Sequence, residues 1–205
     1  LAVDLELAVD GAGIDLSRHP HERDVVVHVA DLEMTDGAGD ADRSLVDVVD
    51  VQVDTGSGDV RLEQVAAGKV DIDTGSGDIR LQDVAGSMSC DTGSGDIVGE
   101  ALKLGSNLNA DTGSGDITLS GDFSAVARIA IDTGSGDVTL EASPATAAPQ
   151  VRVAVSTGSG EISLDLPSSR VTHSGRGDVQ AEIGAATGSA TISTGSGDVT
   201  LRAAP

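Results

Sequence analysis

The sequence has 205 residues, with 12 lysines and arginines against 34 aspartates and glutamates, so its formal net charge at pH 7 is −22. Such a surface repels nucleic-acid phosphates and anionic lipid headgroups, which excludes nucleic-acid partners. No apolar run approaches the length of a membrane span, so we expect no membrane insertion by this chain. Phe123 is the single aromatic residue, which indicates a regular core of valine, isoleucine, leucine and alanine.

Residues 1–50 show only partial regularity and predict one or two irregular coils. Apolar residues alternate from Val3 to Val9, and the stretches 11–16 and 35–40 echo the glycine-containing corner found later in the chain. Between the two echoes, residues 18–24 have the composition of a polar loop. The two histidines in this loop, His19 and His21, flank a proline and are a candidate metal pair.

From residue 51 onward a six-residue signature dominates the chain. Asp-Thr-Gly-Ser-Gly-Asp occurs unchanged at 54–59, 73–78, 91–96, 111–116 and 132–137, and variants occur at 156–161, 173–178 and 193–198. Apolar residues alternate with period two on both sides of each copy, which is typical of strands. Each repeat therefore predicts a strand, a tight glycine-containing corner, a second strand and a more variable return.

These repeats predict an all-β fold, a right-handed parallel β-helix or β-solenoid. Coils of about 20 residues cannot bury their apolar faces alone, but stacked coils can. We expect about eight regular coils over residues 51–205, one irregular N-terminal part over 1–50, and a single domain over 1–205. Residues 143–150 contain two prolines and predict an excursion loop. A flatter two-faced solenoid is the alternative.

The signature also contains Asp-Thr-Gly, the active-site sequence of aspartic proteases, in which two aspartates share a proton. A protease needs two such copies from separate lobes, whereas here five recur at coil spacing on one edge. We therefore interpret the signature as a corner, with glycines for unusual backbone angles and Thr55 and its equivalents facing inward.

Stacked coils place the acidic residues in columns, and these are the candidate metal site. The first aspartates of the five unchanged copies form one column. The last acidic residues form another column: Asp59, Asp78, Asp96, Asp116, Asp137, Glu161, Asp178 and Asp198. Hard oxygen ligands from successive coils suit Ca²⁺, so a calcium ladder is one hypothesis. Simple screening of the charge by counter-ions is the other, and no further cofactor is expected.

Three other motifs have simpler interpretations. Arg176-Gly177-Asp178 spells an integrin-binding tripeptide but lies in the corner register of the repeat. Cys90 lies in an inward column and is expected to pack as a small apolar residue. An enzyme on this scaffold would need a cleft and acids at unique positions, whereas the acids here are repeated. We expect no enzymatic activity.

The repeated Asp-Thr-Gly-Ser-Gly-Asp followed by Val or Ile, any residue and Leu resembles a bacterial β-strand-repeat family of unknown function that is grouped with adhesins. The resemblance extends from about Val51 to Leu201. It implies a non-catalytic extracellular or cell-surface β-solenoid that acts as a structural or adhesive module, with an unidentified adhesive ligand. A filament subunit that stacks end to end and a Ca²⁺-dependent binding module are the alternatives.

The last signature, at 193–198, is followed by only one short apolar alternation and then Ala203-Ala204-Pro205. An uncovered final coil presents unpaired backbone groups that can template another strand. We therefore expect either that the native chain continues beyond these limits or that the molecules self-associate through the ends of the solenoid.

Overall fold

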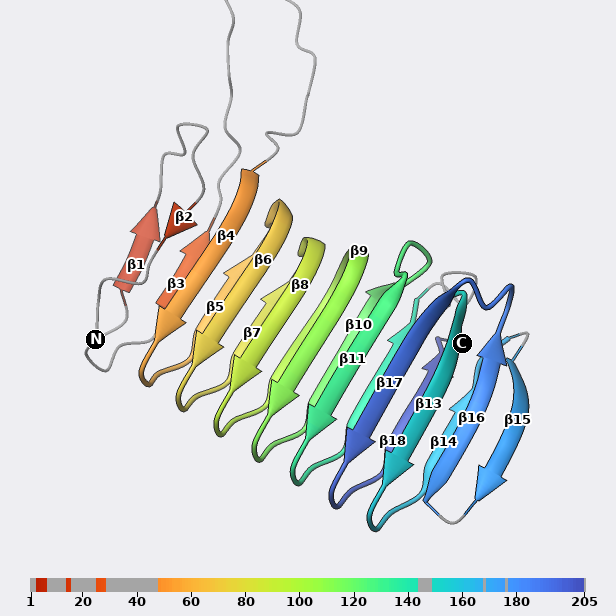
Figure 1. Cartoon of the computed structure of the whole chain (residues 1–205). Coiled ribbons are helices and arrows are strands. Elements are labelled where there is room, and N and C mark those ends of the chain that lie inside the picture. The colour runs from red at the N-terminus through yellow and green to blue at the C-terminus, as the bar shows by residue number, and fades with distance from the viewer. Residues whose placement is uncertain are drawn as a thin grey trace, which may run out of the picture.

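The computed structural model describes residues 3–6, 14–15, 25–28, 48–143, 149–167, 169–175 and 177–204. All regular structure in these residues is β, as the sequence predicts, and the strands stack into a solenoid-like array (Figure 1). The described residues contain no helix of the length and hydropathy needed to cross a membrane.

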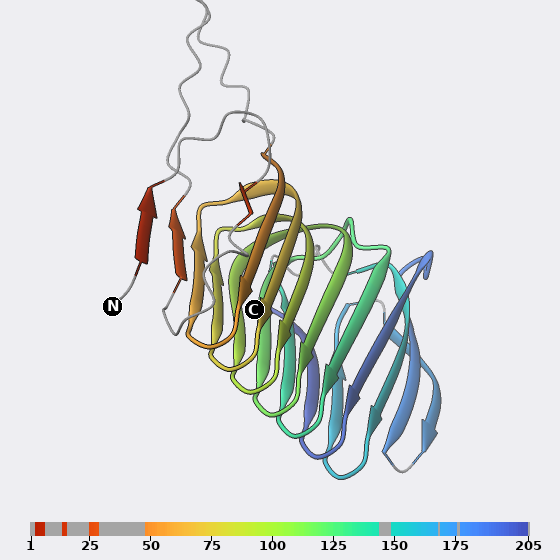
Figure 2. The same ribbon diagram turned by 60° about the vertical axis from the view of Figure 1, so that its left-hand side comes forward.

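The strands lie on two faces, joined at the corners that the signature forms (Figures 1 and 2). The incoming face consists of the strands that lead into a corner and of the strands that extend their sheet. The outgoing face consists of the strands that leave a corner and of the strands paired with them. The incoming face contains, in order of pairing, β2 (Ile14–Asp15), β4 (Val48–Thr55), β6 (Ala66–Thr74), β8 (Ala85–Thr92), part of β9 (Ile97–Thr112), β11 (Arg128–Thr133), β17 (Gly188–Thr194), β13 (Val151–Thr157), β16 (Asp178–Ile183) and β15 (Ser169–Gly175). The outgoing face contains β1 (Val3–Glu6), β3 (Val25–His28), β5 (Val60–Glu63), β7 (Ile79–Gln82), the start of β9, β10 (Ile117–Asp122), β12 (Val138–Ala142), β18 (Val199–Ala203) and β14 (Ile162–Asp165).

Parallel pairing in register converts the sequence alternation into apolar columns. On the incoming face Val51, Val70, Met88, Leu108 and Ile129 are consecutive register partners, and all five are buried. Because side chains alternate between the two sides of a strand, the residues between them face solvent. The two faces share one apolar core, which confirms the predicted inward parity from residue 51 to residue 142.

Phe123, the one aromatic residue of the sequence, lies outside the regular columns. It follows β10 directly and is buried together with Val126 in the connection that leads to β11. Asp122 stabilises the start of this connection, because its Oδ1 accepts hydrogen bonds from both the backbone nitrogen and the hydroxyl of Ser124. The large side chain therefore fills an irregular gap that valine and isoleucine columns leave open.

The order of the coils in space differs from their order in the sequence at the C-terminal end. β17 pairs with β11 on one side and β13 on the other, and β18 pairs likewise with β12 and β14. The coil formed by residues 188–203 is thus inserted between the coils formed by 128–142 and 151–165. The prediction that the last signature forms an uncovered end of the stack is wrong, because both edges of this coil are paired.

The copy of the signature at 173–178 does not form a corner. β15 and β16 are antiparallel, and Gly175 and Asp178 are register partners, so the chain reverses direction between them as a hairpin. β16 also pairs antiparallel with β13. The corner predicted at this seventh copy is therefore incorrect, because the two strands that flank it lie on the same face.

Several predictions fall wholly or partly outside the described residues. These predictions concern both echoes of the corner, the polar loop with His19 and His21, and residues 144–148 of the predicted excursion loop. At the margins of that loop Gln150 is described, and its side-chain oxygen accepts a hydrogen bond from the backbone of Ala185. Its backbone oxygen accepts bonds from Gly188 and from the hydroxyl of Thr187, so Gln150 holds the segment that leads into the inserted coil.

Candidate functional site

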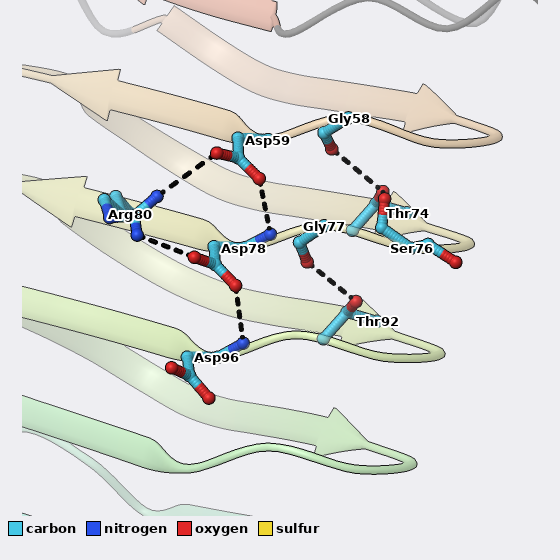
Figure 3. Close-up of polar contacts among 9 residues, drawn as sticks. All are labelled: Gly58, Asp59, Thr74, Ser76, Gly77, Asp78, Arg80, Thr92 and Asp96. Atoms are coloured by element: carbon cyan, nitrogen blue, oxygen red, sulfur yellow. Dashed lines mark hydrogen bonds and ion pairs between the residues drawn. The ribbon is translucent and has the colours of Figure 1, made fainter.

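In six copies of the signature the threonine ties its coil to a neighbouring coil. Thr92 is buried and its hydroxyl donates to the carbonyl oxygen of Gly77 at 3.0 Å (Figure 3). The same bond joins Thr74 to Gly58, Thr112 to Gly95, Thr133 to Gly115, Thr194 to Gly136 and Thr157 to Gly197. The inward parity predicted for these threonines is confirmed, and every buried hydroxyl gains a partner that offsets its loss of water.

The two glycines of the signature are needed because the corners stack backbone against backbone. A Cβ on Gly113 would lie 2.5 Å from the carbonyl oxygen of Gly93. Gly115 has a φ of +151°, and a Cβ there would lie 2.1 Å from the oxygen of Gly95. Any side chain would push successive coils apart at this edge.

The last aspartate of the signature forms a continuous hydrogen-bonded ladder along the edge of the stack. The Oδ1 atom of Asp78 accepts a bond from the backbone nitrogen of Asp96 at 3.0 Å, as Asp59 does from Asp78 at 2.9 Å (Figure 3). Equivalent bonds run from the nitrogens of Asp116, Asp137, Asp198 and Glu161 to the preceding carboxylates, at 2.7–2.9 Å. Each rung bond uses only Oδ1. We name this column the acid ladder.

Among the described residues, the ion pairs of the ladder with a basic side chain lie at its first rungs. Arg80 lies 2.6 Å from Asp78 Oδ2 and 3.5 Å from Asp59 Oδ2, so one guanidinium bridges two coils (Figure 3). The equivalent position holds Val98, Thr118 and Thr139 in the next three coils, which are uncharged. From Asp96 onward the rungs are exposed carboxylates, which makes this part of the edge the most uniformly acidic feature of the corner.

A second acidic column runs along the incoming face. Asp54, Asp73, Asp91, Asp111 and Asp132 are consecutive register partners, as predicted. Burial first, and then the charges of its neighbours in the column, raise the pKa of Asp73 and of Asp111. The column is interrupted at the inserted coil, where the hydroxyl of Ser193 donates to Asp132 Oδ1 at 2.7 Å and Ser193 and Ser156 occupy the next two register positions.

The acid ladder contains seven of the eight residues predicted for it, in a different order. Asp198 stands between Asp137 and Glu161, as the rung bonds show. Asp178 is not a rung, because it pairs with Ser156 and Gly175 in the antiparallel part of the sheet, 3.9 Å from His173. In the part of the chain that the structure describes, no group of three or more histidine, cysteine, aspartate or glutamate side chains has the geometry to hold a metal ion.

The other motifs that the sequence suggests lie apart from the ladder. Cys90 is buried in an inward column, and burial raises the pKa of its thiol to about 12, so it packs as an apolar residue. The Asp-Thr-Gly copies lie side by side in one column, and each threonine after Thr55 is used in a bond to the neighbouring coil. The side chain of Arg176 lies outside the described residues.

The Toastrack DUF4097 family model matches residues 3–150, which is more than half of the chain. The chain belongs to the Toastrack DUF4097 family. No curated protein and no solved structure matches the chain significantly.

The Toastrack match overturns the resemblance to β-strand-repeat adhesins that the signature suggests. The repeated corner is present in both interpretations, but the family is a different one. The match ends at residue 150, and β13, the first strand placed out of sequence order, begins at Val151. The part of the chain that matches the Toastrack family is therefore the part in which the described strands stack in sequence order.

The ladder bonds and the inserted coil were not predicted from the sequence. A column of aspartates is visible in the sequence, but a bond from each carboxylate to the next backbone nitrogen depends on the corner's conformation. The sequence does contain a weak signal for the hairpin at 173–178. The second residue of the signature, which is Thr in the other seven copies, is Ser174 here, and the position before the signature holds the polar Thr172 instead of an apolar residue.

Proposed function

We propose that this chain is a non-catalytic β-solenoid that acts as a structural or adhesive module at the cell surface or outside the cell. One observation carries the proposal. The repeated polar groups of the signature form the bonds that hold coil to coil: Thr92 to Gly77, and Asp78 to the nitrogen of Asp96. Residues used this way in every coil stabilise the scaffold and are not free to take a catalytic role at one unique position.

The geometry also favours a particular surface for adhesion. The acid ladder presents one exposed carboxylate per coil at Asp96, Asp116 and Asp137, in a straight line whose spacing is that of neighbouring strands, about 4.8 Å. A line of equal charges at constant spacing suits a repetitive cationic partner, such as a basic polymer, better than a single small molecule. We therefore propose that adhesion runs through the ladder.

The remaining features of the proposal rest on general rules. Parallel strands joined by crossovers are right-handed in almost all proteins, so we infer a right-handed parallel β-helix with about eight coils, the irregular ones included. The acidic composition, with a net charge of −22, is the feature of the sequence that supports a location outside the cell. Protease treatment of intact cells, followed by detection of the chain, tests this location. Complete protection of the chain would contradict it.

Substitution of the ladder tests the adhesive function. Asparagine keeps an Oδ1 acceptor for the rung bond and removes the charge, so replacing Asp96, Asp116 and Asp137 by Asn should preserve the fold. We expect this triple variant to lose binding to polylysine-coated surfaces at moderate salt.

The matched control removes three charges from the other acidic column, by Asp91→Asn, Asp111→Asn and Asp132→Asn. Binding that falls equally in both triple variants would mean that only net charge matters and would overturn the assignment to the ladder. Circular dichroism and melting curves on each variant exclude a loss of fold as the cause.

A Ca²⁺-dependent role is the second candidate, because the rung bonds fix the carboxylates in one orientation and use only Oδ1. Calcium titration of the parent and of the Asp96, Asp116 and Asp137 triple variant tests it. Calcium binding that is absent from the parent, or unchanged in the variant, would contradict this candidate.

A further inference from the structure

The C-terminal end of the stack is stepped. On the incoming face, β16 and then β15 continue the sheet beyond β13. On the outgoing face, β14 occupies the layer of β13 and pairs, among the described strands, only with β18. Figures 1 and 2 show the two extra strands projecting past the end of the outgoing face. The step is two strands deep.

The step exposes apolar side chains that point toward the core. Val171 is a register partner of Ala181, which is a partner of the buried Val153, so all three lie on the inner side of the sheet. Val171 is nevertheless 52% exposed, the one large hydrophobic residue so exposed among those described. On the opposite face, Ile162 and Leu164 of β14 are only partly buried.

The residues equivalent to Ile162 and Leu164 in the next coil of the stack are fully buried, which shows that β14 lacks a second neighbouring strand among those described. Val199 and Leu201, which are the register partners of Ile162 and Leu164, are 0% and 2% exposed. The difference arises because β18 has a strand on each side whereas β14 has one. Among the described strands, the inner surface at this end therefore lacks a strand next to β14 and a sheet opposite β16 and β15.

The two open edges carry opposite charges. Arg170 and His173 of β15 pair with Glu182 and Gln180, which places them on the outer side of the sheet, away from Val171. On β14, Asp165 is exposed and alternates with the inward Leu164. In a chain with a net charge of −22, a basic residue on one edge strand and an acidic residue on the other form a complementary pair.

We propose that two copies of this chain join tail to tail about a two-fold axis parallel to the strands, so that the stepped ends fill each other. This rotation reverses the stacking direction and exchanges the two faces. The order of strands across the junction becomes β13, β16, β15 and then β14 of the second copy, on both sides of the core. No strand position is left vacant, because the step of each copy is as deep as the overhang of the other.

Strand direction agrees with this arrangement. β15 runs parallel to β13 because both are antiparallel to β16, and the strands of the outgoing face run the opposite way (Figure 1). A rotation about an axis along the strands preserves these directions. β15 therefore lies antiparallel to β14 of the second copy, a regular pairing that satisfies both open backbone edges.

The height of each residue above the corner brings the opposite charges together. Gly175 lies level with Ser156 at the corner end of the incoming face, and Arg170 lies level with Arg152, farther from the corner. β14 starts at the corner with Ile162 and reaches Asp165 at its far end. Antiparallel pairing then sets Asp165 of one copy beside Arg170 of the other, twice in the dimer. A self-complementary surface of this kind gives a closed pair rather than an open filament.

Light scattering coupled to size-exclusion chromatography tests the proposal. The parent chain should have twice the chain mass of 20.3 kDa at high concentration and dissociate on dilution. Val171→Glu should be a monomer with an unchanged melting curve when both are compared at low concentration, since the side chain is already half exposed. Ser94→Glu, which adds the same charge at an exposed corner in the middle of the stack, should remain a dimer.

A charge exchange and hydrogen exchange separate this interface from other contacts. Arg170→Glu and Asp165→Lys should each weaken the dimer about tenfold or more, and the double variant should restore it. Raising the concentration should protect the amides of β14 and β15 and leave those of β4–β8 unchanged. A monomer at millimolar concentration, open filaments, or a dimer that Val171→Glu leaves intact would overturn the proposal.

Discussion

Two glycines at the same position of the repeat differ in what lies beneath them. A Cβ on Gly56 would meet nothing within 4 Å, whereas one on Gly113 would lie 2.5 Å from the oxygen of Gly93. Neither has a positive φ, so the contact is the only difference. Gly113→Ala should lower the free energy of unfolding by about 1–3 kcal/mol, and Gly56→Ala should change it by less than about 0.5 kcal/mol. Urea titration of both variants measures this, and equal effects would show that the corners do not stack as described.

Asp111 opposes folding when it is charged. Burial, and then the charges of Asp91 and Asp132, raise its pKa above the ordinary value. Between the ordinary and the raised pKa the folded chain binds more protons than the unfolded chain, so this residue's contribution to stability falls as pH rises through that window. Asp111→Asn should therefore stabilise the fold at neutral pH, by about 0.5–1 kcal/mol once screening is included.

Asp122 provides the control of opposite sign. Its hydrogen bonds from the hydroxyl and the backbone nitrogen of Ser124 lower its pKa. Its charged form supports the fold, and that support is lost as pH falls through the lowered pKa. Asp122→Asn should destabilise the chain at neutral pH in the same melting experiment. If both asparagine variants shift stability in the same direction, the difference between the two sites is not electrostatic.

At the scale of the strand, the inserted coil should exchange its amide protons unusually slowly for the last strand in a sequence. β18 is paired on both edges, with β12 and β14, while β14 is paired on one. Hydrogen exchange at concentrations where the chain is monomeric should show β18 amides opening only with the global transition, and β14 amides opening earlier. Fast exchange in β18 would mean that the C-terminal coil lies at an end of the stack after all.

The strands and corners could be predicted from the sequence because each follows from local pattern. Period-two alternation predicts that Val51 and Val53 both face inward, and the glycine-containing signature predicts a corner, which is wrong only for the copy at 173–178. The order of stacking could not be predicted, because the inward columns of β17 match those of β11 and β13 equally well. Interchangeable repeats specify that coils pair without specifying which coils pair.

The candidate site was predictable to the same extent. The column of aspartates follows from the repeat, and Asp137 and Asp198 are both recognisable members. Their adjacency depends on the inserted coil, and the exclusion of Asp178 depends on the hairpin. The sequence thus predicts which residues can belong to the ladder, whereas the order in which they lie next to one another depends on the three-dimensional arrangement of the coils.

At the scale of the whole molecule, stability should rise with salt. The seven carboxylates of the acid ladder form six neighbouring pairs, and each pair repels by about 0.9 kcal/mol at about 4.8 Å in water. The Debye length falls from about 10 Å at 0.1 M to about 3 Å at 1 M salt, so most of the relief lies in this range. The melting temperature should increase across a sodium chloride series and flatten in the Asp96, Asp116 and Asp137 triple asparagine variant. A calcium chloride series at matched ionic strength separates specific binding from screening, and a melting temperature indifferent to both salts would contradict the electrostatic account.

The inserted coil also has a consequence for how the chain is made. A ribosome delivers residues 151–165 before residues 188–203, so β13 and β14 emerge while their final neighbours, β17 and β18, do not yet exist. The surface then available to them is β11 and β12, whose inward columns have the same spacing. The nascent chain must either leave the coil of residues 151–165 undocked, or dock it against β11 and β12 and release it again. The order of the coils in the stack is therefore settled only after translation has passed residue 203. A pulse-labelled hydrogen-exchange experiment on the growing chain would show whether β13 first pairs with β11 and is later released from it.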